Sequence, residues 1–204
     1  DGFHSSLDED VLSALMCTVS RNARGRFEEA LQQIKREAMM NGNDAAAHAA
    51  DEGNSSFQED SIQLKVGPIK GIERFAEKIK EYREEAGEAS WPHSQFVSDV
   101  MRALLVVDSA EHMIMVYEAL NESRQFEVVR LKNKIGNQDK PFNLHMNVLF
   151  HPDECKDPIV CEIQLFPACV YKLQHHSHVA YELVRAPSIE SLRTSAEIRS
   201  TRHR

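Results

Sequence analysis

Apolar residues in the N-terminal part of the chain recur every three or four positions, as they do along one face of an amphipathic helix. Ser6 is a candidate N-cap with Glu9 three residues further on, and the apolar period continues to about Asn22. A second stretch with the same period covers 26–40. The pattern predicts a hairpin of two helices, followed by an exposed, mobile connection over 41–56, where turn-forming residues flank small ones.

The remainder of the chain alternates shorter apolar stretches with turn-forming residues. The apolar periods predict an extended segment at 61–66, helices at 69–86, 109–121 and 168–185, and strands at 100–107, 126–134, 142–150 and 159–166. Three consecutive strands with short connections indicate an antiparallel meander, which one crossover helix joins to an earlier strand. We therefore predict an α+β fold in which helices cover a mixed, mainly antiparallel β-sheet of about 4–5 strands.

These elements predict three parts of the chain. We expect the helical hairpin and its connection at 1–56, the α+β domain at 57–186, and a helical or frayed tail at 187–204. Because the first residue is Asp rather than Met, we also expect the chain to be part of a larger polypeptide. The sequence does not determine the oligomeric state.

Composition and charge exclude several classes of protein. A net charge of -8 argues against a general binder of nucleic acids or anionic membranes, because such proteins carry a basic excess. No apolar run approaches the roughly 20 residues of a membrane helix, so no membrane partner is expected. The four cysteines match no zinc-site or CxxC spacing, which indicates a reducing, cytoplasmic compartment; they are Cys17, Cys155, Cys161 and Cys169.

Two carboxylates stand at the apolar strands of the second half. Asp99 opens one predicted strand, and Glu162 lies inside another, with Gln164 on the same face because strand side chains alternate. An unpaired charge in an apolar strand is costly unless a cation matches it. Hard oxygen ligands suit Mg²⁺, which takes its other ligands from water and phosphates. The pattern favours a metal between Asp99 and Glu162, although Asp99 could instead cap a turn.

Basic residues form a stripe on the helix predicted at 69–86. Lys70, Arg74 and Lys78 are spaced four residues apart and therefore share one face, which could hold a polyphosphate. The alternative is a solvated face in which these cations pair with neighbouring glutamates.

The hairpin after the strand predicted at 126–134 is also basic. Lys132, Lys134 and Lys140 surround it and could hold a nucleotide, although lysines at hairpin ends also protect edge strands from aggregation. His145 alternates with apolar neighbours and can face the same cleft. On the last helix, His178 and Tyr181 share a face, where a histidine could donate to a phosphate or carry a proton.

Taken in order, these segments resemble the synthetase domain of the RelA/SpoT family over about 65–185. The corresponding family motifs are G-R-V-K, a strand opened by a metal-binding Asp, K-D-Y, Y-x-S-L-H, E-I-Q and H-x-x-Y. Here they are similar to 67–70, Asp99 with 100–108, 132–133, 141–145, 162–164 and 178–181, respectively. The resemblance implies a nucleotidyltransferase-like fold and transfer of pyrophosphate from ATP to the ribose 3′-hydroxyl of GDP or GTP, as in guanosine tetraphosphate metabolism.

The resemblance also implies roles for individual residues. It implies Mg²⁺ on Asp99 and Glu162, with ATP as the donor substrate. The implied catalytic residues are Asp99, Glu162, Gln164 and His178. The implied nucleotide-binding residues are Lys70, Arg74, Lys78, Arg102, Lys132, Lys140, Phe142, His145 and Tyr181.

The sequence departs from the family pattern at three positions. The two family arginines and the guanine-stacking tyrosine fall on Pro68, Leu104 and Pro141; nearby Arg74, Arg102 and Phe142 are the candidate replacements. A catalytically degenerate module for nucleotide sensing or protein interaction is therefore an alternative. A second alternative is a pyrophosphokinase that acts on an RNA or tRNA 3′ end, against which the acidic charge counts.

Overall fold

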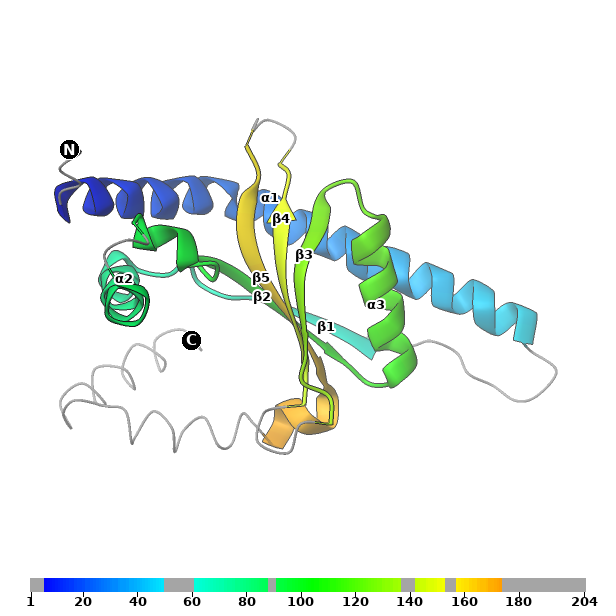
Figure 1. The fold of residues 1–204 in the computed structure, drawn as a ribbon. Coiled ribbons are helices and arrows are strands. Elements are labelled where there is room, and N and C mark those ends of the chain that lie inside the picture. Colours follow the sequence, from blue (N-terminus) through cyan, green and yellow to red (C-terminus); the bar gives the residue numbers. More distant parts are fainter. Residues whose placement is uncertain (1–5, 50–60, 88–90, 137–141, 153–156, 174–204) are drawn as a thin grey trace, which may run out of the picture. The chain divides into compact units, whose positions relative to one another are not determined.

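The computed structural model describes residues 6–49, 61–87, 91–136, 142–152 and 157–173. Residues up to Pro167 belong to one compact unit, and the described part of a second unit, 168–173, is helical. The elements of the first unit are α1 (Ser6–Ala49), β1 (Ile62–Val66), α2 (Ile72–Ala86), the 3₁₀-helix η3 (His93–Phe96), β2 (Met101–Val107), α3 (Ala110–Glu122), β3 (Phe126–Asn133), β4 (Leu144–Phe150) and β5 (Ile159–Pro167) (Figure 1). Within the described residues, no helix is long and apolar enough to cross a membrane.

The five strands form one mixed sheet in the order β1-β2-β5-β4-β3. β2 and β5 run parallel, and the other neighbouring pairs are antiparallel. The meander of β3, β4 and β5 and the α+β class are confirmed. The connection through α3 carries the chain from β2 to β3 at the far edge, and β5 then returns to lie beside β2.

In place of the predicted helical hairpin, the chain forms one helix of 44 residues, α1. The buried positions Ser20, Ala23 and Phe27 keep the helical spacing through the expected turn, and Gly25 is an exposed helical residue there. A glycine inside a helix costs only about 1 kcal/mol relative to alanine, which is less than burying one large apolar side chain contributes. The helix also continues into the predicted mobile connection as far as Ala49, and 50–56 lie outside the described residues.

Helix α2 begins three residues later than the sequence predicts, because the residues before it continue the sheet. The amide of Gly67 donates to the carbonyl of Arg102 at 2.9 Å, and the amide of Lys70 donates to that of Val100 at 3.0 Å. This extended segment therefore runs beside the start of β2 before the chain turns into α2. η3 was not predicted from the sequence.

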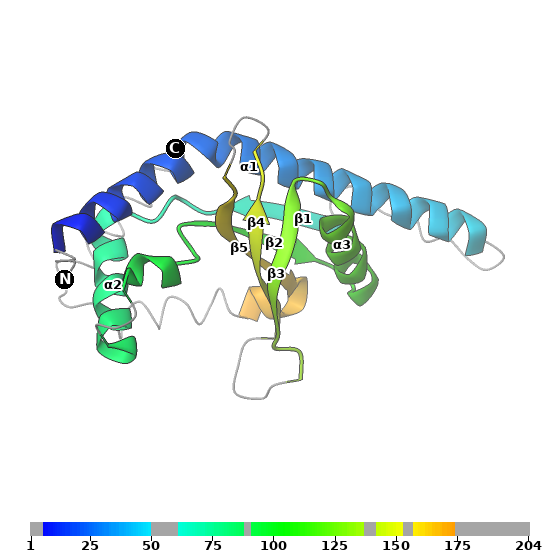
Figure 2. The same ribbon diagram turned by 45° about the horizontal axis from the view of Figure 1, so that its top comes forward.

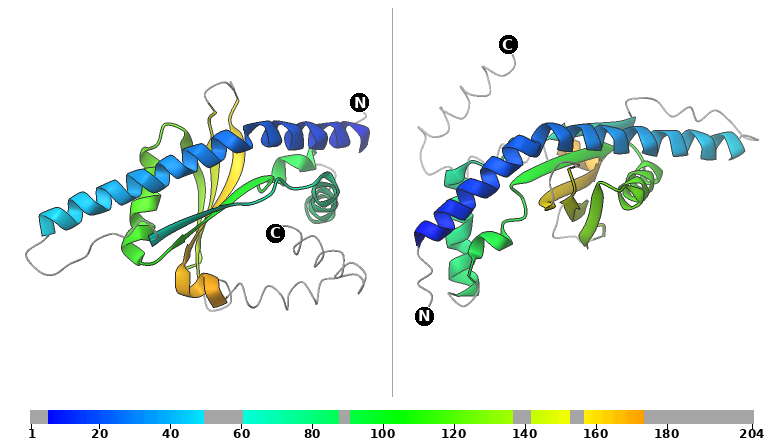
Figure 3. Two further views of the ribbon diagram at one scale, coloured as in Figure 1. Left: turned by 180° about the vertical axis from the view of Figure 1, so that it is seen from behind. Right: turned by 90° about the horizontal axis from the view of Figure 1, so that it is seen from above.

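Helices α1 and α3 pack on one face of the sheet, and α1 crosses the strands (Figure 3). Three aromatic rings meet there: Phe27 of α1 lies 6.0 Å from Phe126 and 5.4 Å from Phe150, measured between ring centroids. Near its N-terminus α1 extends beyond the sheet toward α2 (Figure 2). A smaller core there contains Cys17, Phe75 and other buried residues of α2 and the η3–β2 connection. The opposite face of the sheet is free of both helices α1 and α3.

Candidate active site

Two adjacent rows of side chains, all of them polar except Leu104, lie on the sheet face opposite α1 and α3. Residues paired directly across neighbouring strands project to the same side of a sheet, so register places them next to one another. One row consists of Arg102, Glu162, Asn147 and Arg130, and the next consists of Lys65, Leu104, Gln164, His145 and Lys132. The predicted site residues of β2, β4 and β5 therefore share one face, which we call the polar face.

Glu162 is the buried carboxylate of the polar face, with an exposed fraction of 9%. Its Oε2 atom lies 2.9 Å from His145 Nε2, and Gln164 Nε2 donates to its Oε1 atom. Burial acts to raise the pKa of Glu162, but the hydrogen bond and charge of His145, the hydrogen bond of Gln164 and the charge of Arg102 outweigh it. The pKa therefore lies below the ordinary glutamate value, and Glu162 is an anion at neutral pH.

A lysine orients the imidazole that contacts Glu162. Lys134 Nζ lies 3.3 Å from His145 Nδ1. Because an ammonium group can only donate, Nδ1 accepts this bond and Nε2 carries the proton that it donates to Glu162. Lys134 therefore holds the ring with Nε2 directed at Glu162.

The network continues to the start of β4. Asn143 Nδ2 lies 3.4 Å from Gln164 Oε1, and Asn143 is buried. Since Gln164 presents its amide nitrogen to Glu162, its oxygen faces Asn143 and orients that amide as well. Among the described residues, the buried Oδ1 atom of Asn143 has no hydrogen-bond partner. Sequence analysis missed Asn143, although the alternation of β4 places it on the same face as His145.

Asp99 lies in the segment before β2, where it pairs with a lysine. Lys70 Nζ donates to both carboxylate oxygens of Asp99, at 2.6 and 2.7 Å. Next to Asp99, the hydroxyl of Ser98 accepts from Asn147 Nδ2 at 2.9 Å. Asn147 pairs directly with Glu162 across β4 and β5. The Ser98–Asn147 bond therefore ties the Asp99 segment to the polar face beside Glu162.

Arg102 lies over Gly67, a position without a side chain. A Cβ atom at Gly67 would be 3.0 Å from Arg102 Cγ and 3.2 Å from Nε, which is closer than ordinary van der Waals contact. In the register of β2 and β5, Arg102 lies opposite Glu162. Leu104, at the family's arginine position, lies opposite Gln164. The arginine of this chain therefore stands one row away from the family position and next to the buried carboxylate.

The other predicted cations lie further from the carboxylates or outside the described residues. On α2, Arg74 contacts Glu77, and Lys78 contacts Glu81 at 2.6 Å. The hydrogen bond that Lys78 donates to Glu81 raises the pKa of Lys78 against the effect of burial, and the charges of Glu81 and Asp99 also raise it. The charge of Asp99 thus contributes to the raised pKa of Lys78, whose ion-pair partner is Glu81.

The remaining predicted nucleotide-binding residues are distributed as follows. Lys132 is exposed in the row of His145, and Phe142 is exposed just before β4. Lys140, His178 and Tyr181 lie outside the described residues.

The donor chemistry of the site fits a divalent cation with few protein ligands. No group of three or more His, Cys, Asp or Glu side chains in the described part of the chain could hold a metal ion. Mg²⁺ needs only one or two carboxylates when substrate phosphates supply further oxygens. Asp99 already holds a cationic group, the ammonium of Lys70, on both oxygens. These observations are compatible with Mg²⁺ bound together with a polyphosphate.

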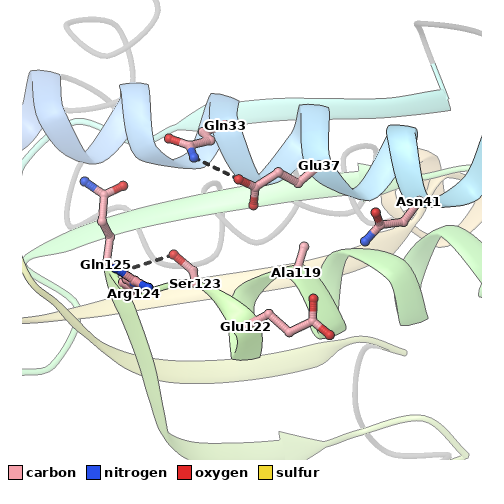
Figure 4. Close-up of a pocket in the computed structure, with 8 residues that line it drawn as sticks. All are labelled: Gln33, Glu37, Asn41, Ala119, Glu122, Ser123, Arg124 and Gln125. Atoms are coloured by element: carbon pink, nitrogen blue, oxygen red, sulfur yellow. Dashed lines mark hydrogen bonds between the residues drawn. The ribbon is translucent and has the colours of Figure 1, made fainter.

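A separate pocket of about 490 Å³ opens on the helical side of the sheet, between α1 and α3 (Figure 4). It is lined by Gln33, Glu37, Asn41, Ala119, Glu122, Ser123, Arg124 and Gln125. None of these residues belongs to the polar face. The pocket is therefore not the site that the carboxylates form.

Several solved structures share this fold. The match to smu.1046c of Streptococcus mutans UA159 has a TM-score of 0.52 and 17% identity, and covers 88% of this chain and 84% of that one. Small alarmone synthetase 1 of Bacillus subtilis, bound to its product pppGpp, matches with a TM-score of 0.52 and 16% identity over 90% of this chain and 93% of that one. The same synthetase bound to AMPCPP matches with a TM-score of 0.50 and 13% identity over 90% of this chain and 91% of that one.

Comparison of the sequence with family models and with curated proteins found no match. At the identities of the solved structures, the likeness establishes the fold. The chain has the RelA/SpoT-like synthetase fold that the order of its motifs predicts.

Proposed function

We propose that this chain is a Mg²⁺-dependent pyrophosphokinase that transfers the β,γ-pyrophosphoryl group of ATP to the 3′-hydroxyl of a nucleotide, GDP, GTP or a related acceptor. The observation that carries the proposal is the buried, ionised Glu162 between Arg102 and His145, on a sheet face to which the Asp99–Lys70 pair is tied. The fold supports the same class of reaction, because one matching synthetase binds pppGpp and AMPCPP.

The carboxylates and the cations have different roles in this scheme. Asp99 and Glu162 would hold Mg²⁺, which when bound neutralises charge on the ATP phosphates. Lys70 contacts Asp99, and Arg102 is the register neighbour of Glu162, so these two cations would stabilise charge on the transferring group. Arg74 and Lys78 on α2 would contact outer phosphate oxygens after leaving their glutamate partners.

The reaction is a displacement at the β-phosphorus of ATP. The 3′-hydroxyl oxygen of the acceptor forms the new bond to phosphorus, the bond from that phosphorus to the α–β bridging oxygen breaks, and AMP leaves. The hydroxyl proton must go to a base. As an alternative to binding the metal, Glu162 would accept that proton or orient the hydroxyl, with Gln164 and His145 holding its position.

Acceptor binding would use the remaining predicted residues. Phe142 is exposed and lies next to the position of the family's stacking tyrosine, so it would stack on the base. Lys132 and Lys140 would contact acceptor phosphates. The resemblance assigns a catalytic role to His178 and a nucleotide-binding role to Tyr181.

Transfer of label from γ-³²P-ATP with Mg²⁺ to GDP, GTP, ADP, AMP or bulk tRNA tests the proposal. Glu162→Gln should abolish transfer, since the amide can neither accept a proton nor supply an anionic ligand. The matched control is Glu118→Gln, which makes the same change at an exposed position of α3. Label transferred equally by both variants, or to no acceptor by the wild-type chain, contradicts the proposal; label on tRNA alone identifies an RNA 3′ end as the acceptor.

A nucleotide-sensing module without turnover is the second candidate function. It is favoured by Lys70, which occupies both oxygens of Asp99, and by the residues at the family's arginine positions, Pro68 and Leu104. It predicts that AMPCPP or GDP binds the wild-type chain while no label is transferred.

A further inference from the structure

The contact between Lys70 and Asp99 uses the atoms that a metal would use. Both carboxylate oxygens accept from the same ammonium group, and the side chain of Lys70 is only 10% exposed. A cation that binds Asp99 through its oxygens must therefore displace this ammonium or share the carboxylate with it. Glu162 differs, because an imidazole and an amide contact its oxygens, and no ammonium group occupies them both.

Two contacts hold the backbone of Lys70 in place. Its amide donates to the carbonyl of Val100 at 3.0 Å, and its carbonyl lies 3.5 Å from the thiol of Cys17 on α1. The following residue, Gly71, begins the turn into α2. We therefore expect the lysine side chain to release Asp99 by rotation, while these backbone contacts stay in place.

The free energy of that rotation depends on whether the ammonium group finds a new anionic partner. A lysine that leaves Asp99 without a new anion is a largely desolvated, unpaired cation, which is costly. A polyphosphate beside the site supplies the anion. We therefore expect Asp99 to bind a metal ion weakly when the metal is alone and more tightly when a polyphosphate is present.

We propose that Lys70 occupies the cation position at Asp99 until a polyphosphate draws it away, so that binding of the divalent metal and of the nucleotide donor is coupled. This inference rests on the proposed function for the assignment of Asp99 as a metal ligand. By linkage, the metal must strengthen polyphosphate binding by the same factor as the polyphosphate strengthens metal binding.

Calorimetric titration of Mn²⁺ into the full chain, without nucleotide, tests the exchange. Lys70→Met should bind Mn²⁺ about tenfold more tightly than the wild-type chain, a value within the usual range of coupling between sites. The matched control is Lys80→Met, which removes the same charge from an exposed position of α2 and should leave the affinity unchanged. The double variant with Lys70→Met and Asp99→Asn should lose this gain in Mn²⁺ affinity.

Two further variants separate charge competition from a loss of structure. Lys70→Arg keeps a cation that can pair with both carboxylate oxygens, so its Mn²⁺ affinity should stay low. Lys70→Gln keeps a hydrogen-bond donor without the charge, so it should bind Mn²⁺ more tightly than the wild-type chain even if Lys70→Met does not fold. Mn²⁺ should also raise the melting temperature of the Met and Gln variants more than that of the wild type.

Equal Mn²⁺ affinity in the wild-type, Gln and Met chains overturns the exchange, and so does tight binding by Lys70→Arg. The assay contains no nucleotide and measures no transfer. If label transfer fails while the Mn²⁺ pattern is as expected, the exchange stands and only the assignment of a transferase is wrong.

Discussion

One face of the β-sheet packs against α1 and α3 through aliphatic and aromatic side chains, whereas the other carries a hydrogen-bonded network of ionisable and amide groups. On the first face, stability comes from area removed from water, which is not directional. On the second, Glu162 is kept ionised by particular donors, His145 and Gln164 among them. The same strands supply both faces. A substitution on the helix-covered face should therefore change stability, whereas a substitution at the next position, on the polar face, should change the chemistry of the site.

Phe27 is the position that should separate the two faces most clearly. Phe27→Ala should lower the free energy of unfolding by about 3–5 kcal/mol, because removal of a fully buried ring that contacts two other rings leaves a cavity. On the polar face, Arg130→Ala removes an exposed side chain and should change it by about 0.5 kcal/mol or less. Urea denaturation measures both, and similar losses in the two variants would contradict the distinction.

Gly67 tests whether the polar face depends on how Arg102 is placed. The backbone angle of Gly67 is not in the left-handed region, so Gly67→Ala acts through the contact with Arg102 and should turn that side chain. We expect a loss of roughly 0.5–1.5 kcal/mol in AMPCPP binding, the usual cost of forcing a side chain off its rotamer.

Arg102→Ala provides the matching background for that substitution. In a chain without the arginine, Gly67→Ala should have no further effect on AMPCPP affinity, because nothing is left to displace. Additive losses in the double variant would show that the glycine acts through the backbone instead.

The pH dependence of stability distinguishes Glu162 from a carboxylate that is merely buried. Because its folded pKa lies below the ordinary value of 4.5, its ionised form stabilises the fold. That contribution is complete above the unfolded pKa and is lost as the pH falls through the folded pKa. The stability difference between the wild-type chain and Glu162→Gln should therefore shrink as the pH falls below about 4.5 in a series of urea titrations, and a difference that grows there would contradict the assignment.

The smallest effect is expected on α2. Arg74→Ala removes an exposed pair with Glu77, and such pairs contribute about 0.3–0.5 kcal/mol. Thermal unfolding should therefore change little, while AMPCPP affinity should fall if Arg74 contacts phosphate. A change in stability without a change in affinity would leave Arg74 as part of a solvated helix face.

The sequence predicted the strands well and the long helix poorly. The bounds of β2, β3 and β5 differ from the prediction by one residue, because alternation of side chains along a strand is a local property. The predicted turn near Gly25 is absent, because packing of α1 on the sheet extends the buried stripe through it. Local propensity was outweighed by tertiary contacts.

The candidate site shows the same division. Alternation along a strand is enough to place Glu162 and Gln164 on one face, and the order of the motifs is enough to indicate the fold. The pairing of Lys70 with Asp99 and the bond between Ser98 and Asn147 join residues far apart in the chain. No local period encodes such contacts, so sequence analysis placed Lys70 in a stripe with other cations and missed Asn147.

By itself, the sequence determined which segments are strands, which side chains share a strand face, and the acidic charge of the whole chain, since each depends on neighbouring residues or on composition. The tertiary structure decided that β5 lies between β2 and β4, that α1 is continuous, and that Lys70 neutralises Asp99 while His145 and Arg102 surround Glu162. These features arise from contacts that form only when distant segments pack together, and their free energy depends on burial that no single segment has alone.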